Sequence, residues 1–201
     1  IYGSSATRTT TTATMGIASG KWYWEVNKNA SGDELGGITN VSDYAGIYPG
    51  SASGSWGYYG GDGQKYVEGT ASNYGAAYTT GDIIGFALDM DAGTLVAYKN
   101  NSSQGTLASS LTGDIYPAIG DGAGTGTTNN AFNFGQDPTF AGFMDSTTSA
   151  KTPSNSGAGT ADSEGNGKFF YAPPSGFLSL CSANLEEPTI GANSLTQASD
   201  H

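Results

Sequence analysis

The stretch GDIIGFALDMDAGTLVAYKNN, Gly81 to Asn101, decides the fold of this chain. From Ile83 to Met90 the larger apolar residues alternate with a second set of residues, the period of two that places successive side chains on opposite faces of a β-strand. Asp91-Ala92-Gly93 predicts a tight reversal, because glycine tolerates the positive φ that such turns need. Thr94 to Lys99 predicts the returning strand. This antiparallel hairpin has extensive apolar faces, so we expect a second sheet to cover it.

Length and composition favour one all-β domain. The chain has 201 residues, 32 of them glycine, and only 12% charged residues, which is typical of a turn-rich β-protein. Alternation places Trp22 and Trp24 in the core, and Pro117 favours an edge position for its strand. No convincing helix is found. Further strands are predicted at Lys21 to Val26, Trp56 to Tyr59, Gln64 to Val67, Gly113 to Gly120, Ala131 to Phe134 and Phe177 to Cys181.

The formal charge of −11 excludes two classes of partner. An acidic protein repels the phosphates of nucleic acids and the anionic headgroups of membranes. No apolar run approaches the length that spans a bilayer. The sequence therefore predicts no nucleic-acid partner and no membrane insertion.

Catalysis finds little support in the residues. The single cysteine, Cys181, lies in an apolar run, and the single histidine, His201, is the last residue, so no cysteine or serine nucleophile has a histidine base. Glu25 with Asp89 and Asp91 could suggest a sugar-cleaving carboxylate pair. However, the predicted turn explains Asp91, and Glu25 faces away from the tryptophans. We expect no enzyme and no catalytic residue.

A calcium site is conceivable at the hairpin turn, where Asp89 and Asp91 precede Gly93. Calcium prefers six or more oxygen ligands, more than this turn offers. The pair is therefore interpreted as turn-forming, with calcium in other acidic loops left open as an alternative. The sequence predicts no metal site and no cofactor.

Six stretches, taken in order, carry a family resemblance: GKWYWEV (20–26), YYGGDGQKY (58–66), GDIIGFALDMDAGTLVAYKNN (81–101), IYPAIGDG (115–122), NFGQ (133–136) and PPSGFLSLC (173–181). Together they resemble the SPRY (B30.2-like) domain. The resemblance spans about residues 12 to 190. It implies a bent antiparallel β-sandwich of two sheets, concanavalin- and jelly-roll-like, with little or no helix, no catalytic centre, and partners bound by loops at one end.

The final stretch, PPSGFLSLCSANLEEPTI at Pro173 to Ile190, looks most like SPRY-containing structural proteins of tailed bacteriophages. This likeness implies a location in a virion, on the extracellular surface of the particle. A homotrimer is expected if the protein forms part of a fibre. The expected organisation is a linker or edge strand at 1–11, the sandwich at 12–190 with a polar insertion at 145–167, and a linker or tail of a longer chain at 191–201.

Loop tyrosines are the candidate binding residues, because tyrosine can stack on sugars or fill protein hot spots while donating a hydrogen bond. The alternative is that half of them or more are core residues. The predicted function is a non-catalytic binding module of a tail fibre or appendage that recognises a host surface glycan or protein through loops 40–55, 60–63 and 145–167. The alternative function is a structural decoration or linker domain contacting other virion subunits. The candidate residues are Tyr44, Tyr48, Tyr58, Tyr59, Asp62, Tyr66 and Tyr74.

Overall fold

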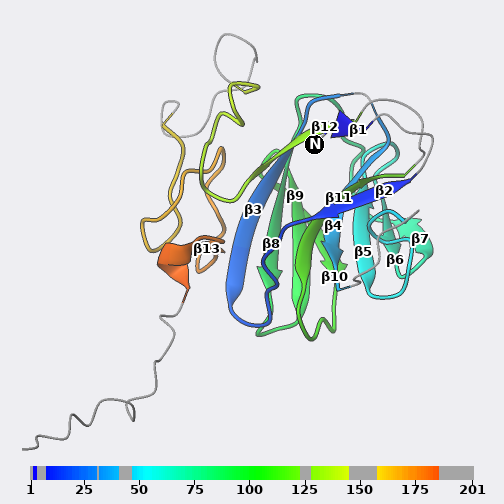
Figure 1. The fold of residues 1–201 in the computed structure, drawn as a ribbon, viewed down its shortest axis with the longest axis horizontal. Coiled ribbons are helices and arrows are strands. Elements are labelled where there is room, and N and C mark those ends of the chain that lie inside the picture. The colour runs from blue at the N-terminus through cyan, green and yellow to red at the C-terminus, as the bar shows by residue number, and fades with distance from the viewer. Residues whose placement is uncertain are drawn as a thin grey trace, which may run out of the picture.

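A computed structural model gives the structure of the protein. It describes residues 2–3, 8–30, 32–40, 47–122, 128–144 and 158–185. The candidate residue Tyr44, the terminal His201 and most of the predicted insertion at 145–167 lie outside these described residues. The described residues form two antiparallel sheets that pack face to face (Figure 1).

The first sheet contains the hairpin that the sequence predicts. Its order is β1-β12-β3-β8-β9-β10, and β13 pairs in parallel with β3. In the hairpin, Ile84 pairs with Lys99 and Asp89 pairs with Thr94, and Gly93 in the turn has φ 64°. The strands are β1 (Tyr2–Gly3), β12 (Thr128–Asn133), β3 (Lys21–Lys28), β8 (Ile83–Asp89), β9 (Thr94–Lys99), β10 (Ser102–Ala108) and β13 (Leu178–Ser179).

The second sheet covers the hairpin, as expected. Its order is β2-β11-β4-β5-β6-β7. Between the sheets Trp24 stacks on Phe86 with ring centroids 5.5 Å apart, and both side chains are fully buried. The strands are β2 (Thr9–Thr12), β11 (Tyr116–Asp121), β4 (Glu34–Thr39), β5 (Ser55–Tyr59), β6 (Gln64–Val67) and β7 (Thr70–Asn73).

The predicted fold class is confirmed. The helical segment among the described residues is a single 3₁₀ turn, η1 (Ser182–Asn184). A membrane-crossing helix, long and apolar enough for a bilayer, is not found within the described part of the chain.

The prediction for Pro117 is wrong, because β11 lies between β2 and β4 and is not an edge strand. Pro117 is near the beginning of β11, opposite Ile38 of β4. Its carbonyl accepts the N–H of Ala13, just beyond the end of β2, at 2.9 Å. An N–H at position 117 would therefore donate only at the end of the β2–β11 hydrogen-bond ladder. Its absence there costs little stability.

Strand β3 is buried on both faces, which its alternating pattern did not predict. Trp22, Trp24 and Val26 face the core between the sheets. On the opposite face, residues 158–185 pack against the strand, with the Phe169 and Tyr23 rings edge to face at 5.1 Å. Figure 1 shows this C-terminal segment on the outer side of the first sheet, away from β5, β6 and β7.

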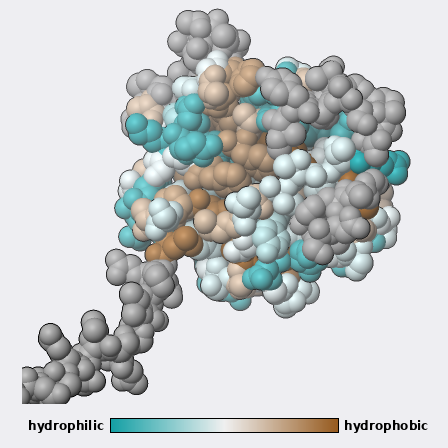
Figure 2. Space-filling view, viewed as in Figure 1, coloured by the Kyte–Doolittle hydropathy of each residue, from teal (hydrophilic) through white to brown (hydrophobic). Residues whose placement is uncertain are grey.

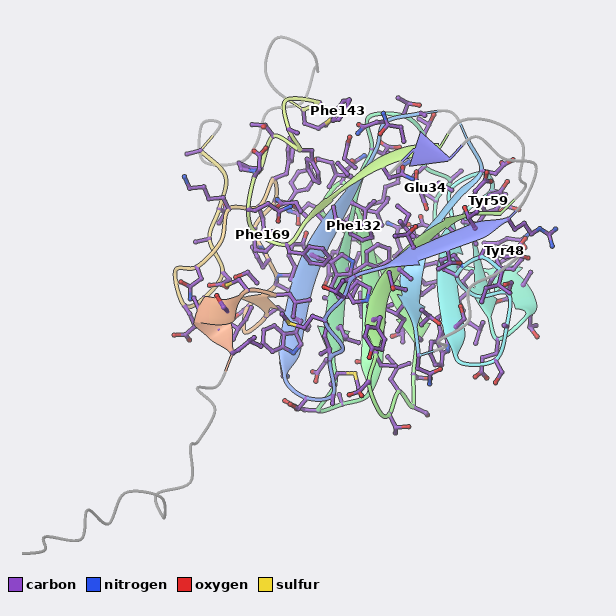
Figure 3. All side chains as sticks on the ribbon, in the orientation of Figure 1. Glu34, Tyr48, Tyr59, Phe132, Phe143 and Phe169 are labelled. Carbon is purple, nitrogen blue, oxygen red and sulfur yellow. The ribbon has the colours of Figure 1, made fainter. Side chains whose placement is uncertain are left out.

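One face of the molecule leaves the core partly uncovered. Figure 2 shows apolar surface in the middle of this face, and Figure 3 places Phe132 of β12 there. Phe132 and Phe134 are half-buried and stack with centroids 5.3 Å apart and an interplanar angle of 8°. Aromatic surface is therefore exposed beside β12.

Candidate functional site

Three of the predicted tyrosines meet on the outer face of the second sheet. Trp56 and Tyr58 of β5 face the core, so the alternation of the strand turns Tyr59 outward. Tyr66 of β6 lies opposite Gly57, on the same outer face. The Tyr66 ring contacts Tyr48 at 5.6 Å and Tyr59 at 6.2 Å, in both cases edge to face.

These rings surround a pocket of about 130 Å³. The guanidinium of Arg8 lies 5.1 Å from the centroid of the Tyr48 ring, a cation–π distance, and its Nε donates to the Gly122 carbonyl at 2.9 Å. We call this the tyrosine pocket. Its lining residues are Arg8, Leu35, Tyr48, Tyr59, Tyr66 and Gly122.

The loop that carries Tyr48 lies directly on the sheet. A Cβ at Gly57 would come within 2.1 Å of the Pro49 carbonyl oxygen, so only glycine permits this approach. Thr10 of β2 fixes the same loop by donating to the Ile47 carbonyl at 2.8 Å. The Tyr48 N–H is satisfied by the Ser51 hydroxyl at 3.0 Å. The sheet and its edge strand therefore position the Tyr48 ring.

Tyr59 is held by a charged neighbour. Its hydroxyl donates to Asp33 Oδ1 at 2.5 Å. Burial, together with this hydrogen bond and the negative charge of Asp33, raises the pKa of Tyr59 well above its usual range. The phenol therefore stays protonated at neutral pH. Figure 3 shows Tyr48 and Tyr59 on the same side of the molecule, with Glu34 nearby.

The other candidate residues lie elsewhere. Tyr58 lies in the predicted strand but is fully buried in the core, which corrects its choice as a surface binding residue and agrees with the core alternative. Tyr74 is half-buried against that core, and its hydroxyl donates to the Gly105 carbonyl at 2.6 Å. Asp62 is exposed in the turn after β5, where it accepts the Gln64 N–H at 2.9 Å. The structure therefore brings together Tyr48, Tyr59 and Tyr66.

The described part of the insertion does not join this group. Asp162 accepts the Ser179 N–H at 2.7 Å, which fixes it to β13 beside β3 of the first sheet. The tyrosine pocket is on the outer face of the second sheet. Residues 158–167 and the three tyrosines therefore belong to opposite faces of the sandwich.

Sequence reasoning missed Arg8, Asp33 and Leu35. Leu35 lies on the outer face of β4, and the loop before β5 covers its side chain. Arg8, the basic residue among the N-terminal threonines, was the one available signal. The contact of Asp33 with Tyr59 joins residues 26 positions apart and has no local signature.

The carboxylates weighed for catalysis do not converge. Lys21 of β3 pairs with Asp89 and Glu25 with Gly85, so Glu25 and Asp89 are separated by four residues along the strands. That spacing corresponds to about 13 Å at roughly 3.3 Å per residue, beyond the separation used by paired carboxylates in glycosidases. Asp89 instead pairs with Lys21 at 2.8 Å, and Asp91 accepts the Gly20 N–H at 3.0 Å. Within the described ranges, no group of three or more His, Cys, Asp or Glu side chains is arranged to hold a metal ion.

The family model of the SPRY domain matches residues 21–137, more than half of the chain. The chain belongs to the SPRY family. The match begins at β3 and ends just after β12, so it includes the β8–β9 hairpin and strands β5 and β6, which carry Tyr59 and Tyr66.

Curated relatives share this region. Ran-binding protein 9 of Xenopus tropicalis is 34% identical over 125 residues, covering 60% of this chain and 22% of that protein. Human Ran-binding protein 9 is 33% identical over 107 residues, covering 51% of this chain and 15% of that protein. The dual specificity protein kinase splA of Dictyostelium discoideum is 34% identical over 114 residues, covering 54% of this chain and 5% of that protein. The chain therefore spans about a fifth or less of the length of these eukaryotic relatives.

Solved SPRY structures share the fold. The crystal structure of the SPRY domain of human HERC1 has a TM-score of 0.58 at 20% identity, covering 64% of this chain and 83% of that one. A second human SPRY domain structure has a TM-score of 0.54, also at 20% identity, covering 64% of this chain and 86% of that one. SPRY domains mediate protein–protein interactions and are generally non-catalytic.

Proposed function

We propose that this SPRY protein is a non-catalytic binding module that recognises a protein partner through the tyrosine pocket. The observation that carries the proposal is the convergence of Tyr48, Tyr59 and Tyr66 around one pocket, with Arg8 against the Tyr48 ring. Tyrosine and arginine are the residue types that dominate hot spots in protein interfaces. Glu25 and Asp89, the carboxylates considered for catalysis, are separated by four residues along paired strands, which supports a binding role over catalysis.

The pocket suits one side chain or a short turn of a partner. Its volume is about 130 Å³, and Leu35 supplies apolar lining while the phenols and the guanidinium supply hydrogen-bond donors. Because Thr10 and Asp33 hold the loop and the Tyr59 ring, the pocket is formed before a partner arrives. A preformed site loses less entropy on binding.

A displayed peptide library selected against the full protein tests the proposal. Peptides bound at the pocket are expected to lose about tenfold or more in affinity with Tyr48→Ala or Tyr66→Ala. Phe143→Ala is the matched control, because Phe143 is an aromatic residue that is 42% exposed elsewhere on the surface. If every selected peptide bound the two tyrosine variants as tightly as the unchanged protein, the pocket would not be the recognition site.

We further propose that the module works in a virion, on a tail fibre or appendage of a tailed bacteriophage, where the partner is a host surface protein or glycan. The support is a sequence resemblance: the stretch Pro173 to Ile190 looks most like SPRY-containing structural proteins of tailed bacteriophages. This stretch lies beyond the residues matched by the family model. Its described part docks on the sandwich through the short strand β13. The alternative is a structural role, in which the same surface contacts neighbouring virion subunits.

Two measurements separate these settings. Adsorption of the isolated protein to host cells, or to an array of envelope glycans, is expected to fall with Tyr66→Ala if the module recognises a host. A structure of the intact particle in which the tyrosine pocket is packed against neighbouring subunits would favour the structural role. Sedimentation of the full protein tests the homotrimer expected of a fibre.

A further inference from the structure

Lys28 and Glu34 close one end of the sandwich from the inside. Lys28, the last residue of β3, lies on the same face as Trp24 and Val26, and Glu34, the first residue of β4, lies on the same face as Ile38. The two charged residues therefore belong to the core-facing sides of opposing sheets. Lys28 is 4% exposed and Glu34 is 2% exposed.

A pocket of about 370 Å³ opens at this end, separate from the tyrosine pocket. It lies where three connections meet: the one that leads into β4, the turn after β5, and the residues before β8. Its lining residues include Asp33, Gly60 and Gly61. Lys28 and Tyr78 also line the pocket.

The Lys28 ammonium has no ion-pair partner within 4.0 Å among the described residues. It donates to the Gly32 carbonyl at 2.7 Å and lies 5.5 Å from the centroid of the Tyr78 ring. Among the described residues no carboxylate lies within 4.0 Å of it, since the ion pairs found there are Lys21 with Asp89 and Lys99 with Asp82. An ammonium has three N–H donors, so one carbonyl leaves two of them for another acceptor.

Glu34 faces the same end of the core, but its carboxyl oxygens are not within 4.0 Å of the Lys28 ammonium. Its carboxyl accepts no hydrogen bond from the described residues, and burial raises its pKa to about 8, although the nearby Lys28 charge acts in the opposite direction. The raised pKa favours the protonated, neutral form of this carboxyl. Asp33, on the wall of the pocket, has one carboxylate oxygen already engaged by the Tyr59 hydroxyl at 2.5 Å.

We propose that this end pocket binds a single carboxylate group of a partner peptide, with Lys28 as its charge partner. The carboxylate comes either from an acidic side chain or from the free C-terminus of the peptide. A buried charge without a partner is costly, and an ion that pairs with it inside a low-dielectric site is bound more strongly than in water. The net charge of −11 repels polyanions at long range, so one carboxylate fits better than a phosphate cluster. The inference goes beyond the tyrosine pocket and does not depend on it.

The first experiment titrates the full protein with sodium acetate and follows the backbone amide resonances of Gly60, Gly61 and Ala77. Acetate is expected to shift them, whereas acetamide, a neutral molecule of the same shape, is not. Equal shifts with acetate and acetamide would overturn the proposal, because charge would then play no part. Tyr66→Ala is expected to leave acetate binding unchanged, so failure of the tyrosine pocket and failure of this inference are distinguishable.

Variants identify the charge partner. Lys28→Met keeps the apolar stem and is expected to weaken acetate binding about tenfold or more, while Lys168→Met, at a lysine away from this pocket, changes nothing. Glu34→Gln is expected to bind acetate within about twofold of the unchanged protein. A gain of about tenfold in Glu34→Gln would show that Glu34 already neutralises Lys28, which contradicts the proposal. This arm decides the matter even if Lys28→Met does not fold.

Short peptides identify the source of the carboxylate. Acetyl-Gly-Gly-Ala has a free C-terminus, and acetyl-Gly-Asp-Gly-amide has only an acidic side chain. If one of these two peptides shifts the amide resonances at the end pocket, the proposal is supported, and that peptide identifies the source of the carboxylate. If acetyl-Gly-Ala-Gly-amide, which has no carboxylate, produced the same shifts, the proposal would be overturned.

Discussion

The backbone N–H of Phe170 donates to the buried carboxylate of Glu25 at 2.8 Å, and so joins the C-terminal segment to the outer face of β3. The same carboxylate accepts the Tyr171 N–H at 2.8 Å and the Asn133 side-chain amide at 3.2 Å. The Tyr23 hydroxyl is a fourth donor, at 3.3 Å. Glu25 is therefore the point at which residues from three segments, distant in sequence, meet.

Glu25→Ala is expected to lower the free energy of unfolding by about 3 kcal/mol, because it leaves the buried N–H of Phe170 and the partly buried N–H of Tyr171 without an acceptor. Urea unfolding measures the loss. Glu164→Ala is the control, since Glu164 is an exposed glutamate of the same segment and should change little. Equal stability of the Glu25 and Glu164 variants would show that the segment is held mainly by its aromatic contacts.

Asp162 anchors the same segment at a second place. Its Oδ2 accepts from the Ser179 N–H at 2.7 Å and from the Asn184 amide at 2.7 Å, and its Oδ1 accepts the Asn166 N–H at 2.9 Å. These hydrogen bonds hold the pKa of Asp162 below its usual range despite the opposing effect of burial. The group therefore contributes stability above its ordinary pKa of 3.8, and this contribution is lost as the pH falls through its lowered pKa.

Asp162→Ala is expected to release β13 while the core stays folded. Hydrogen exchange at Ser179 and Asn184 should accelerate by about tenfold or more, corresponding to roughly 1.4 kcal/mol of local stability. Asp114→Ala, at an exposed aspartate, is the matched control. Uniform acceleration across β8 and β9 would mean instead that the segment and the core unfold together.

The periodic part of the fold could be predicted from the sequence because apolar alternation is a local signal. It located the β8–β9 hairpin, and it put Trp22 and Trp24 into the core. Strands without apolar alternation were missed. Strand β7 and most of strand β10 consist of exposed, polar residues. These residues form strands because they hydrogen-bond to a neighbouring strand, β6 or β9.

The candidate site was only partly predictable. Alternation divides the residues of a strand between two faces, but tertiary packing decides which face is buried. Tyr58 and Tyr59 are adjacent, and only the packing of the second sheet decides which one is buried. Glu25 is a second example. Alternation correctly turned it away from the tryptophans, but only the tertiary structure shows that the C-terminal segment covers that face. Contacts such as Tyr59 with Asp33 and Arg8 with Tyr48 depend on tertiary structure alone.

The two buried glutamates predict how stability depends on pH. Burial raises the pKa of Glu25 to about 7 and that of Glu34 to about 8, from the ordinary 4.5. Because the folded state holds these protons more tightly than the unfolded state, their contribution is fully present below about pH 4.5 and is lost as the pH rises through about 7 and 8. The free energy of unfolding, from urea titrations, should therefore be higher at about pH 5 than at about pH 9.

Glu34→Gln separates this effect from the general repulsion of an acidic protein. The amide does not titrate, so the variant should lose less stability than the unchanged protein between about pH 6 and pH 9. Glu68→Gln is the control, since Glu68 is an exposed glutamate. Parallel pH profiles for the Glu34 variant and the unchanged protein would show that Glu34 titrates normally in the folded state.

Gly57→Ala tests whether the sheet positions the tyrosine pocket. The new Cβ would lie 2.1 Å from the Pro49 carbonyl oxygen, so the loop that carries Tyr48 must move off the sheet. The inward neighbours Trp56 and Tyr58 should stay in the core, and the loss of stability is expected to be about 2 kcal/mol. The contact between the Tyr48 and Tyr66 rings, now 5.6 Å between centroids, should disappear from nuclear Overhauser spectra.

The same change should weaken peptides bound at the tyrosine pocket by about tenfold or more, since Tyr48 no longer faces Tyr66. Ser72→Ala on the exposed strand β7 is the control for a small substitution in the second sheet, and it should alter neither the ring contact nor binding. A Gly57→Ala protein that kept the ring contact but lost binding would place recognition on the backbone around Gly57. One that lost the contact and kept full affinity would remove Tyr48 from the site, leaving Tyr59, Tyr66 and Arg8 to carry recognition.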